Sequence, residues 1–220
     1  GVVKILKVID IVKKKPEESI DFALQHYFKP SKIKKEFLKN TKGKIQFGVS
    51  IYLMNEEVKA FGEPKKIGMF IKRAMQEGGS SIRLVLQEFN SLALASVVVT
   101  NNLLIEKGAE ICILAGHDKV YTCKTLRVQD FEDYGRRDYQ RPARDDKAGM
   151  IPPKVAQSML NLAKTSPGEV MLDPFCGVGT LVQEGMLLGS RMLGTDKSKI
   201  AIINSEKNLE WFRNRYKIPK

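Results

Sequence analysis

The pattern of apolar positions in the first 126 residues predicts a mixture of strands and helices. Apolar and polar residues alternate over 45–53, which is typical of a strand. Runs rich in β-branched residues predict further strands, and apolar residues at helical spacing predict helices. We expect strands at 1–9, 45–53, 81–86, 110–115 and 119–126, the last two forming a hairpin through 116–118. We expect helices at 17–40, with a break near Pro30, and at 66–76. The stretch 93–99 is apolar, and we expect residues 103–107 to close a helix at Gly108.

The last 70 residues follow a more regular order. Pro152 and Pro153 precede a helix with an apolar face, and proline suits the first turn of a helix. A strand at 170–172, a helix at 181–188, a strand at 191–196 and a helix from about 198 to 215 come next. This βαβα order begins a doubly wound parallel sheet. The predicted fold class is therefore α/β, with a compact α/β domain followed by the first part of a Rossmann-like sheet.

A polar tract separates these two parts. Residues 127–149 contain six basic and six acidic residues and almost no aliphatic periodicity. We interpret the tract as an ordered polar linker or a functional loop. The predicted organisation is a basic segment at 1–44, a compact α/β domain at 45–126, and a C-terminal domain at 127–220.

The charge of the chain is strongly positive and unevenly distributed. The net charge is +12, and residues 1–44 alone hold 12 lysines against five acidic residues. Such a surface favours a polyanionic partner, and nucleic acid is the commonest; a solvated lysine face is the alternative. Three widely spaced cysteines predict neither a disulfide framework nor a zinc site, and the two isolated histidines predict no metal. We expect no membrane segment and a cytoplasmic location.

The most informative motif is DPFCGVGT at 173–180, directly after a short apolar strand. An acid at the end of a strand can accept hydrogen bonds from a ligand, and glycines let the backbone approach that ligand. Asp173, Gly177 and Gly179 supply these features, and Thr180 begins the next helix. Asp196 lies at the tip of the second strand, where an acid can hold ribose hydroxyls.

The same motif distinguishes between cofactors. Val182 stands where the third glycine of a dinucleotide fingerprint belongs, which argues against NAD. S-adenosylmethionine (SAM) has no phosphate, and its amino-acid end can meet Asp173 while its ribose meets Asp196. We therefore predict SAM as the cofactor. The alternative is that the two glycines only make a tight turn and Asp196 only caps a helix.

DPFCGVGT and the preceding tract from Val128 to Ala163 resemble the tRNA guanosine-10 N2-methyltransferases, a class I SAM-dependent family. Residues 45–126 resemble the THUMP domain of that family in FGVSIY, SIRLV and SLALASVVVTNNLL. Residues 1–9 look like the last strand of the small domain that precedes THUMP. The resemblance implies a THUMP-like RNA-binding domain at 45–126, the N-terminal part of a methyltransferase domain at 127–220, and methylation of an exocyclic guanine nitrogen in tRNA.

The resemblance also implies site residues. The cofactor-binding set comprises Met150, Pro152, Lys154, Asp173, Pro174, Phe175, Cys176, Gly177, Gly179, Thr180 and Asp196. A plain helix start remains an equal explanation for the first three, and a small apolar filler is favoured over a reactive thiol for Cys176. Candidates for RNA contact are Lys72, Arg73 and Arg83 in the THUMP-like part and Arg136, Arg137 and Arg141 in the polar tract. For these last three arginines an internal ion-pair network with the neighbouring aspartates is an equal alternative.

One expected motif is missing. The family holds the acceptor nitrogen in a D/N-P-P-Y motif, and the only Pro-Pro pair here, Pro152-Pro153, follows Ile151 and lies upstream of the glycine loop. We therefore expect a chain truncated at both ends, with no catalytic acceptor residue and no activity alone. An rRNA or DNA amino-methyltransferase and a non-catalytic RNA-binding protein with a vestigial SAM fold remain alternatives. The modified nucleotide, the degree of methylation, an activating partner and the oligomeric state are not predicted.

Overall fold

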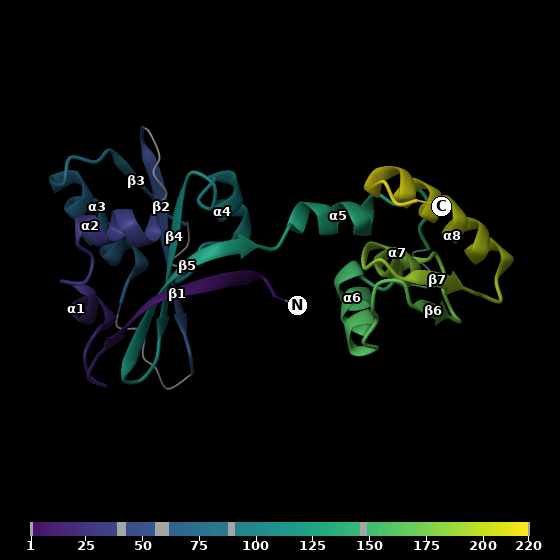
Figure 1. Cartoon of the computed structure of the whole chain (residues 1–220), viewed down its shortest axis with the longest axis horizontal. Helices are drawn as coiled ribbons and strands as arrows, with labels where there is room; N and C mark the ends of the chain where they lie inside the picture. The colour runs from purple at the N-terminus through teal and green to yellow at the C-terminus, as the bar shows by residue number, and fades with distance from the viewer. Residues whose placement is uncertain (1, 39–42, 56–61, 88–90, 146–148, 220) are drawn as a thin grey trace. The chain divides into compact units, whose positions relative to one another are not determined.

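The computed structural model describes residues 2–38, 43–55, 62–87, 91–145 and 149–219 (Figure 1). The chain divides into two compact units, Val2–Gln129 and Asp130–Lys220. The expected boundary between residues 44 and 45 differs from this division, because the first strand pairs along its length with a strand of the same N-terminal unit. The helices of the described residues include none long and apolar enough to cross a membrane.

The N-terminal unit contains a five-stranded mixed sheet in the order β1-β5-β4-β2-β3. Strand β2 is parallel to both of its neighbours, β3 and β4, whereas β5 is antiparallel to β4 and β1. The expected hairpin between β4 and β5 is confirmed, and the N–H of Gly116 donates to the carbonyl of Lys119 at 2.8 Å. The strands are β1 (Lys4–Lys13), β2 (Ile45–Leu53), β3 (Ile82–Val85), β4 (Gly108–Ala115) and β5 (Lys119–Val128).

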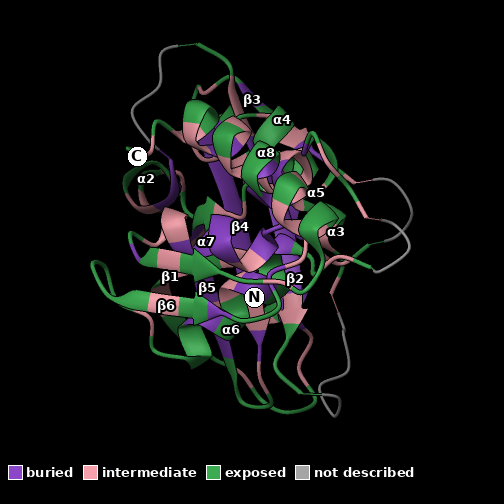
Figure 2. Cartoon of the chain, turned by 90° about the vertical axis from the view of Figure 1, so that its right-hand side faces the viewer, coloured by how far each residue is buried: buried purple, intermediate pink, exposed green. Residues whose placement is uncertain are grey.

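Helices cover one face of this sheet and create its main core. Phe47, Val49 and Ile51 alternate along β2 and are buried against these helices, as the sequence pattern predicts. Strand β4 is buried at nearly every position (Figure 2). The covering elements are α1 (Ile20–Leu24), α2 (Pro30–Lys32), the π-helical turn η1 (Ile33–Phe37) and α3 (Pro64–Glu77). The helix expected over 17–40 is thus several short pieces, because Pro30 starts a new helix.

The other face of the sheet has a smaller core around α4 (Ser96–Asn101). Val85, Leu94, Val99 and Leu104 are buried together there. The helix expected to close at Gly108 ends earlier, at Asn101. Residues 102–107 form turns, and Leu103 has a left-handed φ of 51° that a right-handed helix does not allow.

A buried ion pair fastens edge strand β1 to the centre of the sheet on this side. The Lys4 ammonium lies 2.5 Å from a carboxylate oxygen of fully buried Glu110. Ser50 and Thr125 each donate a hydroxyl hydrogen bond of 2.6 Å to the same carboxylate. Burial opposes the charge of Lys4, but the hydrogen bond and charge of Glu110 outweigh it, so the pKa of Lys4 is raised.

The C-terminal unit has a two-stranded parallel sheet flanked by helices, as the βαβα order predicts. Gly185 allows the helix between the strands to pack closely, since a side chain there would meet Met192 of the second strand. The elements are α5 (Phe131–Tyr139), α6 (Pro153–Leu162), β6 (Val170–Asp173), α7 (Thr180–Leu187), β7 (Arg191–Gly194) and α8 (Lys199–Tyr216). Helix α5 lies in the tract expected to be a linker or loop, and the Asp130 side chain caps it by accepting from the N–H of Asp133 at 2.9 Å.

Candidate cofactor-binding site

The site begins where β6 ends. Asp173 is the last residue of β6 and is 8% exposed, and the loop 174–179 leads directly into α7. Gly177 and Gly179 have φ angles of 53° and 86°, in the left-handed region that glycine tolerates without strain. A side chain at Gly179 would also approach the Ser205 hydroxyl to 2.4 Å. Both glycines are therefore required by the conformation of the turn.

The loops after the two parallel strands are hydrogen-bonded to each other. The N–H of Thr195 donates to the carbonyl of Asp173, and the N–H of Cys176 donates to the carbonyl of Thr195, both at 2.9 Å. The Asp196 carboxylate accepts from the N–H of Gly177 at 3.0 Å and from the N–H of Ser198 at 2.8 Å. These bonds hold the glycine loop in one conformation at the carboxyl edge of the sheet, where ligands bind in open α/β sheets.

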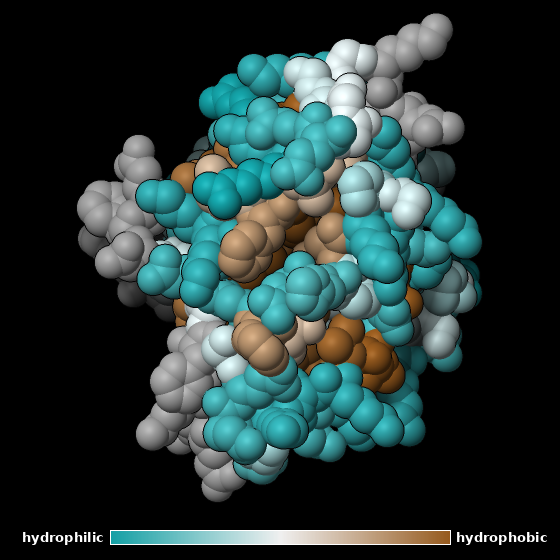
Figure 3. Space-filling view, turned by 90° about the vertical axis from the view of Figure 1, so that its left-hand side faces the viewer, coloured by the Kyte–Doolittle hydropathy of each residue, from teal (hydrophilic) through white to brown (hydrophobic). Residues whose placement is uncertain are grey.

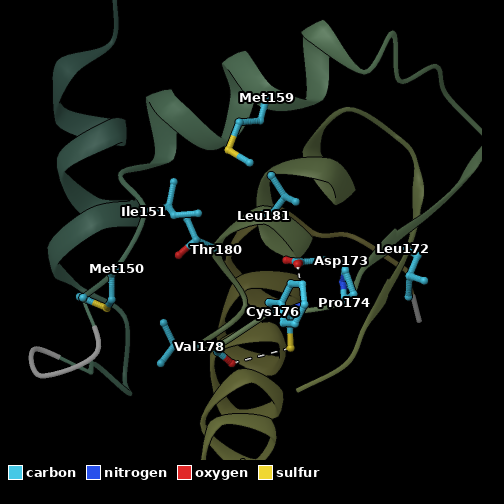
Figure 4. Close-up of a pocket in the computed structure, with 13 residues that line it drawn as sticks. Met150, Ile151, Met159, Leu172, Asp173, Pro174, Cys176, Val178, Thr180 and Leu181 are labelled. Atoms are coloured by element: carbon cyan, nitrogen blue, oxygen red, sulfur yellow. Dashed lines mark hydrogen bonds between the residues drawn. The ribbon is translucent and has the colours of Figure 1, made fainter. Parts of the chain in front are cut away.

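A pocket of about 400 Å³ opens beside this loop (Figure 4). This volume lies in the usual range for small-molecule sites. Met150, Ile151 and Met159 form one wall, and Asp173 and Thr180 contribute polar groups on the side of β6 and α7. The remaining lining residues are Gly149, Leu172, Pro174, Phe175, Cys176, Gly177, Val178 and Leu181. The arrangement combines an apolar wall with one buried carboxylate.

The acids of the site have different electrostatic environments. Burial raises the pKa of Asp173, although the N–H of Phe175 donates to it at 3.2 Å and lowers the pKa in part. The N–H of Ser198 and the N–H of Gly177 lower the pKa of Asp196. Burial and the nearby Asp173 raise the pKa of the Cys176 thiol, which favours a neutral packing group over a reactive thiolate.

Seven of the predicted cofactor residues line the pocket and four do not. Those that line it are Met150, Asp173, Pro174, Phe175, Cys176, Gly177 and Thr180. Of the four others, Pro152 is the N-cap residue of α6, and the ammonium of exposed Lys154 lies 5.4 Å from the Tyr134 ring centroid. Gly179 lies against Ser205, and the Asp196 carboxylate accepts a hydrogen bond from the backbone of the glycine loop. Sequence reasoning missed the apolar lining residues Ile151, Met159, Leu172, Val178 and Leu181, whose pattern indicates only burial.

The structure corrects the assignment of Arg137 and Arg141 to RNA contact. Both are buried, at 5% and 4% exposure, and cannot reach a partner outside the fold. Arg137 pairs with Asp133 at 3.0 Å and with Glu184 of α7 at 3.1 Å. Arg141 pairs with Asp138 at 3.2 Å and donates to the Thr180 hydroxyl. The ion-pair alternative therefore describes these two residues, whereas Arg136 pairs with Glu132 on the partly exposed side of α5.

Glu184 is an ionisable group that the sequence did not single out. It is 1% exposed and faces the Arg137 guanidinium. Burial raises the pKa of Glu184 to about 7, and the charge of Arg137 offsets only part of this effect. The contact between α5 and α7 therefore contains a carboxyl group that titrates near neutral pH.

The candidates for RNA contact in the N-terminal unit remain accessible. Arg73 on α3 and Arg83 on β3 are exposed, and Lys72 is half-buried. Figure 3 shows one face of the chain on which hydrophilic residues surround a smaller apolar area. Among the residues that the structure describes, no cluster of histidine, cysteine and acidic side chains could hold a metal ion.

Comparison with known proteins defines the class of the C-terminal unit. A family model described as the RMKL-like methyltransferase domain matches residues 139–218. A tRNA (guanine(10)-N2)-dimethyltransferase of Methanothermobacter thermautotrophicus is 31% identical over 97 residues, covering 44% of this chain and 28% of that protein. The enzyme of the same name from Methanocaldococcus jannaschii is 44% identical over 48 residues, covering 22% of this chain and 14% of that protein.

Solved structures show the same fold over most of the chain. TrmN from Thermus thermophilus aligns with a TM-score of 0.54 at 15% identity, covering 95% of this chain and 54% of TrmN. SMU.472, a putative methyltransferase complexed with SAH, aligns with a TM-score of 0.52 at 13% identity, covering 98% of this chain and 60% of that chain. This chain thus matches only part of each relative.

Residues 139–218 are a methyltransferase domain of the RMKL-like type. Over part of its length the chain is similar to the tRNA (guanine(10)-N2)-dimethyltransferases, the family that its sequence resembles.

Proposed function

We propose that this chain is part of a SAM-dependent methyltransferase that acts on the exocyclic N2 of a guanosine in tRNA. The observation that carries the proposal is the position of Asp173. Its buried carboxylate lies at the end of β6, beside a glycine loop and a pocket of about 400 Å³. A buried carboxylate without an ion-pair partner within its own loop suits the cationic end of a ligand.

The residues present fit SAM. The Asp173 carboxylate can accept hydrogen bonds from the ammonium of the donor's amino-acid end, and Gly177 leaves the adjacent backbone open, since a Cβ there would meet nothing within 4 Å. The apolar wall of Met150, Ile151 and Met159 offers a surface on which the apolar parts of the donor can pack. When bound, SAM supplies an electrophilic methyl group. Asp196 at the neighbouring loop is the candidate for the ribose hydroxyls, because carboxylate oxygens can accept more than one hydrogen bond.

The proposed RNA-binding part is the THUMP-like domain of the N-terminal unit. Lys72, Arg73, Arg83 and, in the C-terminal unit, Arg136 are the candidates for phosphate contact. The net charge of +12 supports a polyanionic partner. The names of the two curated relatives support tRNA and the guanine N2 position. We also propose a cytoplasmic location, which a role in tRNA modification supports.

We further propose that these 220 residues alone do not transfer a methyl group. Holding an acceptor nitrogen in line with a methyl donor is mainly a matter of positioning. The sequence contains no D/N-P-P-Y motif to provide that positioning, and a guanine in a stem must also leave its stack. The pocket described above would then represent the donor half of a complete site.

Two assays on the 220-residue chain test the proposal. Isothermal titration calorimetry with SAM should show one site, whereas NAD, which lacks the amino-acid end, should not bind. A radiolabelled-methyl assay with unmodified tRNA should show no transfer. Absence of SAM binding would overturn the donor site, and turnover on tRNA would overturn the proposed inactivity.

A further inference from the structure

Asn208 lies on α8 and is fully buried outside the pocket lining. Its side-chain oxygen accepts from the N–H of Ala143 at 2.9 Å, and its side-chain nitrogen donates to the carbonyl of Ala143 at 2.9 Å. The same nitrogen donates to the carbonyl of Val178 at 2.9 Å. One amide group therefore satisfies both backbone groups of one residue and a third backbone group elsewhere.

These partners belong to two segments, one that lines the pocket and one that precedes a lining segment in the chain. Val178 is in the glycine loop and lines the pocket. Ala143 is in the segment 140–145, which we call the strap, and the chain continues from it to the lining residues Met150 and Ile151. Asn208 thus connects the loop under the ligand space to the segment that leads to its apolar wall.

A second contact joins the same two segments. Arg141 of the strap donates to the hydroxyl of Thr180, which lines the pocket at the start of α7. Asp138 holds the Arg141 guanidinium at 3.2 Å. The strap is therefore fixed to the glycine-loop region at two residues. Arg141 makes a direct contact, and Ala143 is held through Asn208 of α8.

We propose that Asn208 is a positioning residue for the donor pocket, which acts by holding the strap and the glycine loop at a fixed separation. This inference rests on the proposed SAM site. An asparagine is required because the site needs one acceptor and two donors on one planar group. Aspartate keeps the acceptor but places a charge against two carbonyl oxygens. Alanine removes the side-chain partner of three backbone groups, two of them part-buried at Ala143 and one buried at Val178.

Substitutions on α8 separate positioning from stability. Asn208→Ala and Asn208→Asp remove the tether. Asn214→Ala is the matched control, since Asn214 is exposed on the same helix. Phe212→Leu is the stability control, because Phe212 is fully buried on α8, and its ring centroid lies 4.5 Å from that of Tyr216.

The readouts are the SAM dissociation constant from calorimetry, the melting temperature, and backbone hydrogen exchange in the free chain. We expect both Asn208 variants to bind SAM at least about tenfold more weakly and to exchange faster at Ala143 and in the glycine loop. Asn214→Ala should match the wild type, and Phe212→Leu should lower the melting temperature with unchanged binding. Wild-type binding by Asn208→Ala, or equal weakening by Phe212→Leu, would overturn the inference while leaving the SAM site intact. No binding by the wild type would overturn both.

Discussion

Asp196 accepts a hydrogen bond of 3.0 Å from the backbone N–H of Gly177. The acid at the tip of β7 therefore supports the glycine loop at the tip of β6 before any ligand is considered. A second hydrogen bond, from the N–H of Ser198 at 2.8 Å, fixes the orientation of the carboxylate. The orientation of the Asp196 carboxylate, which we propose to hold the ribose, is thus fixed by backbone hydrogen bonds, one of them from the glycine loop beside the pocket.

Asp196→Ala should weaken SAM binding by about tenfold or more, because it removes both the proposed ribose acceptor and the support of Gly177. Calorimetry at neutral pH measures this effect. Lys197→Ala, at the exposed neighbouring position, is the control and should bind as the wild type does. Binding of Asp196→Ala within twofold of the wild type would remove Asp196 from the site.

Asp173→Asn should separate stability from binding. Burial raises the pKa of Asp173, so its ionised form is disfavoured in the free folded chain. Stability from this group is present at low pH, where the acid is neutral, and is lost as pH rises from its unfolded pKa through its folded pKa. At pH 7 the asparagine variant should melt at or above the wild-type temperature.

The same variant should lose about 1.5–3 kcal/mol of SAM affinity, because the proposed partner of the donor's ammonium has lost its charge. Scanning calorimetry and titration on one preparation measure the two effects. A variant that is much less stable, or that binds SAM normally, would show that Asp173 has a structural role instead.

Glu184→Gln should change how stability depends on pH. Burial raises the pKa of Glu184 to about 7, above its usual value near 4.3. Its stabilising contribution is therefore present below about pH 4 and is lost as pH rises to about 7. From about pH 4 to about pH 7, the unfolding free energy of the wild type minus that of Glu184→Gln should fall by on the order of 3 kcal/mol.

Urea unfolding followed by tryptophan fluorescence measures this difference. The signal reports on the C-terminal unit, because Trp211 on α8 is the only tryptophan. Parallel stability profiles for the two proteins between pH 5 and 8 would contradict the shifted pKa. Arg137→Lys, which keeps the charge beside Glu184, is the control and should retain the wild-type pH profile shape.

Replacing Lys72, Arg73 and Arg83 together by alanine should weaken tRNA binding and reduce its salt dependence. Each lost phosphate contact lowers the slope of log affinity against log salt concentration by about 1. Filter binding at several salt concentrations measures both effects. Lys199→Ala, at an exposed position of α8, serves as the control. An unchanged slope in the triple variant would show that RNA contacts another surface.

The sequence predicted the elements whose chemistry depends on local residue types. The strand that ends in Asp173 and the turn that needs Gly177 and Gly179 follow from short-range rules, and the structure has them at the expected positions. Strand β2 of the N-terminal unit also follows from alternation, as in Phe47, Val49 and Ile51. These features are determined by spacing within a few residues.

The features that the sequence did not reveal depend on contacts between distant residues. Helix α5 has almost no aliphatic periodicity, because Arg137 and Tyr134 join it to Glu184 and Gln157 through polar bonds. Met159 and Leu160 are neighbouring apolar residues of α6. Met159 lines the pocket whereas Leu160 is buried in the core, and only the fold distinguishes the two. Asn208 gave no signal, since its partner Ala143 lies 65 residues away.

A crystal structure of the chain with S-adenosylhomocysteine tests the central claim most directly. The account predicts density for the ligand in the pocket between Met150 and the glycine loop, with its amino group within hydrogen-bond distance of the Asp173 carboxylate. Ligand bound elsewhere, or a pocket that stays empty at saturating concentration, would contradict it.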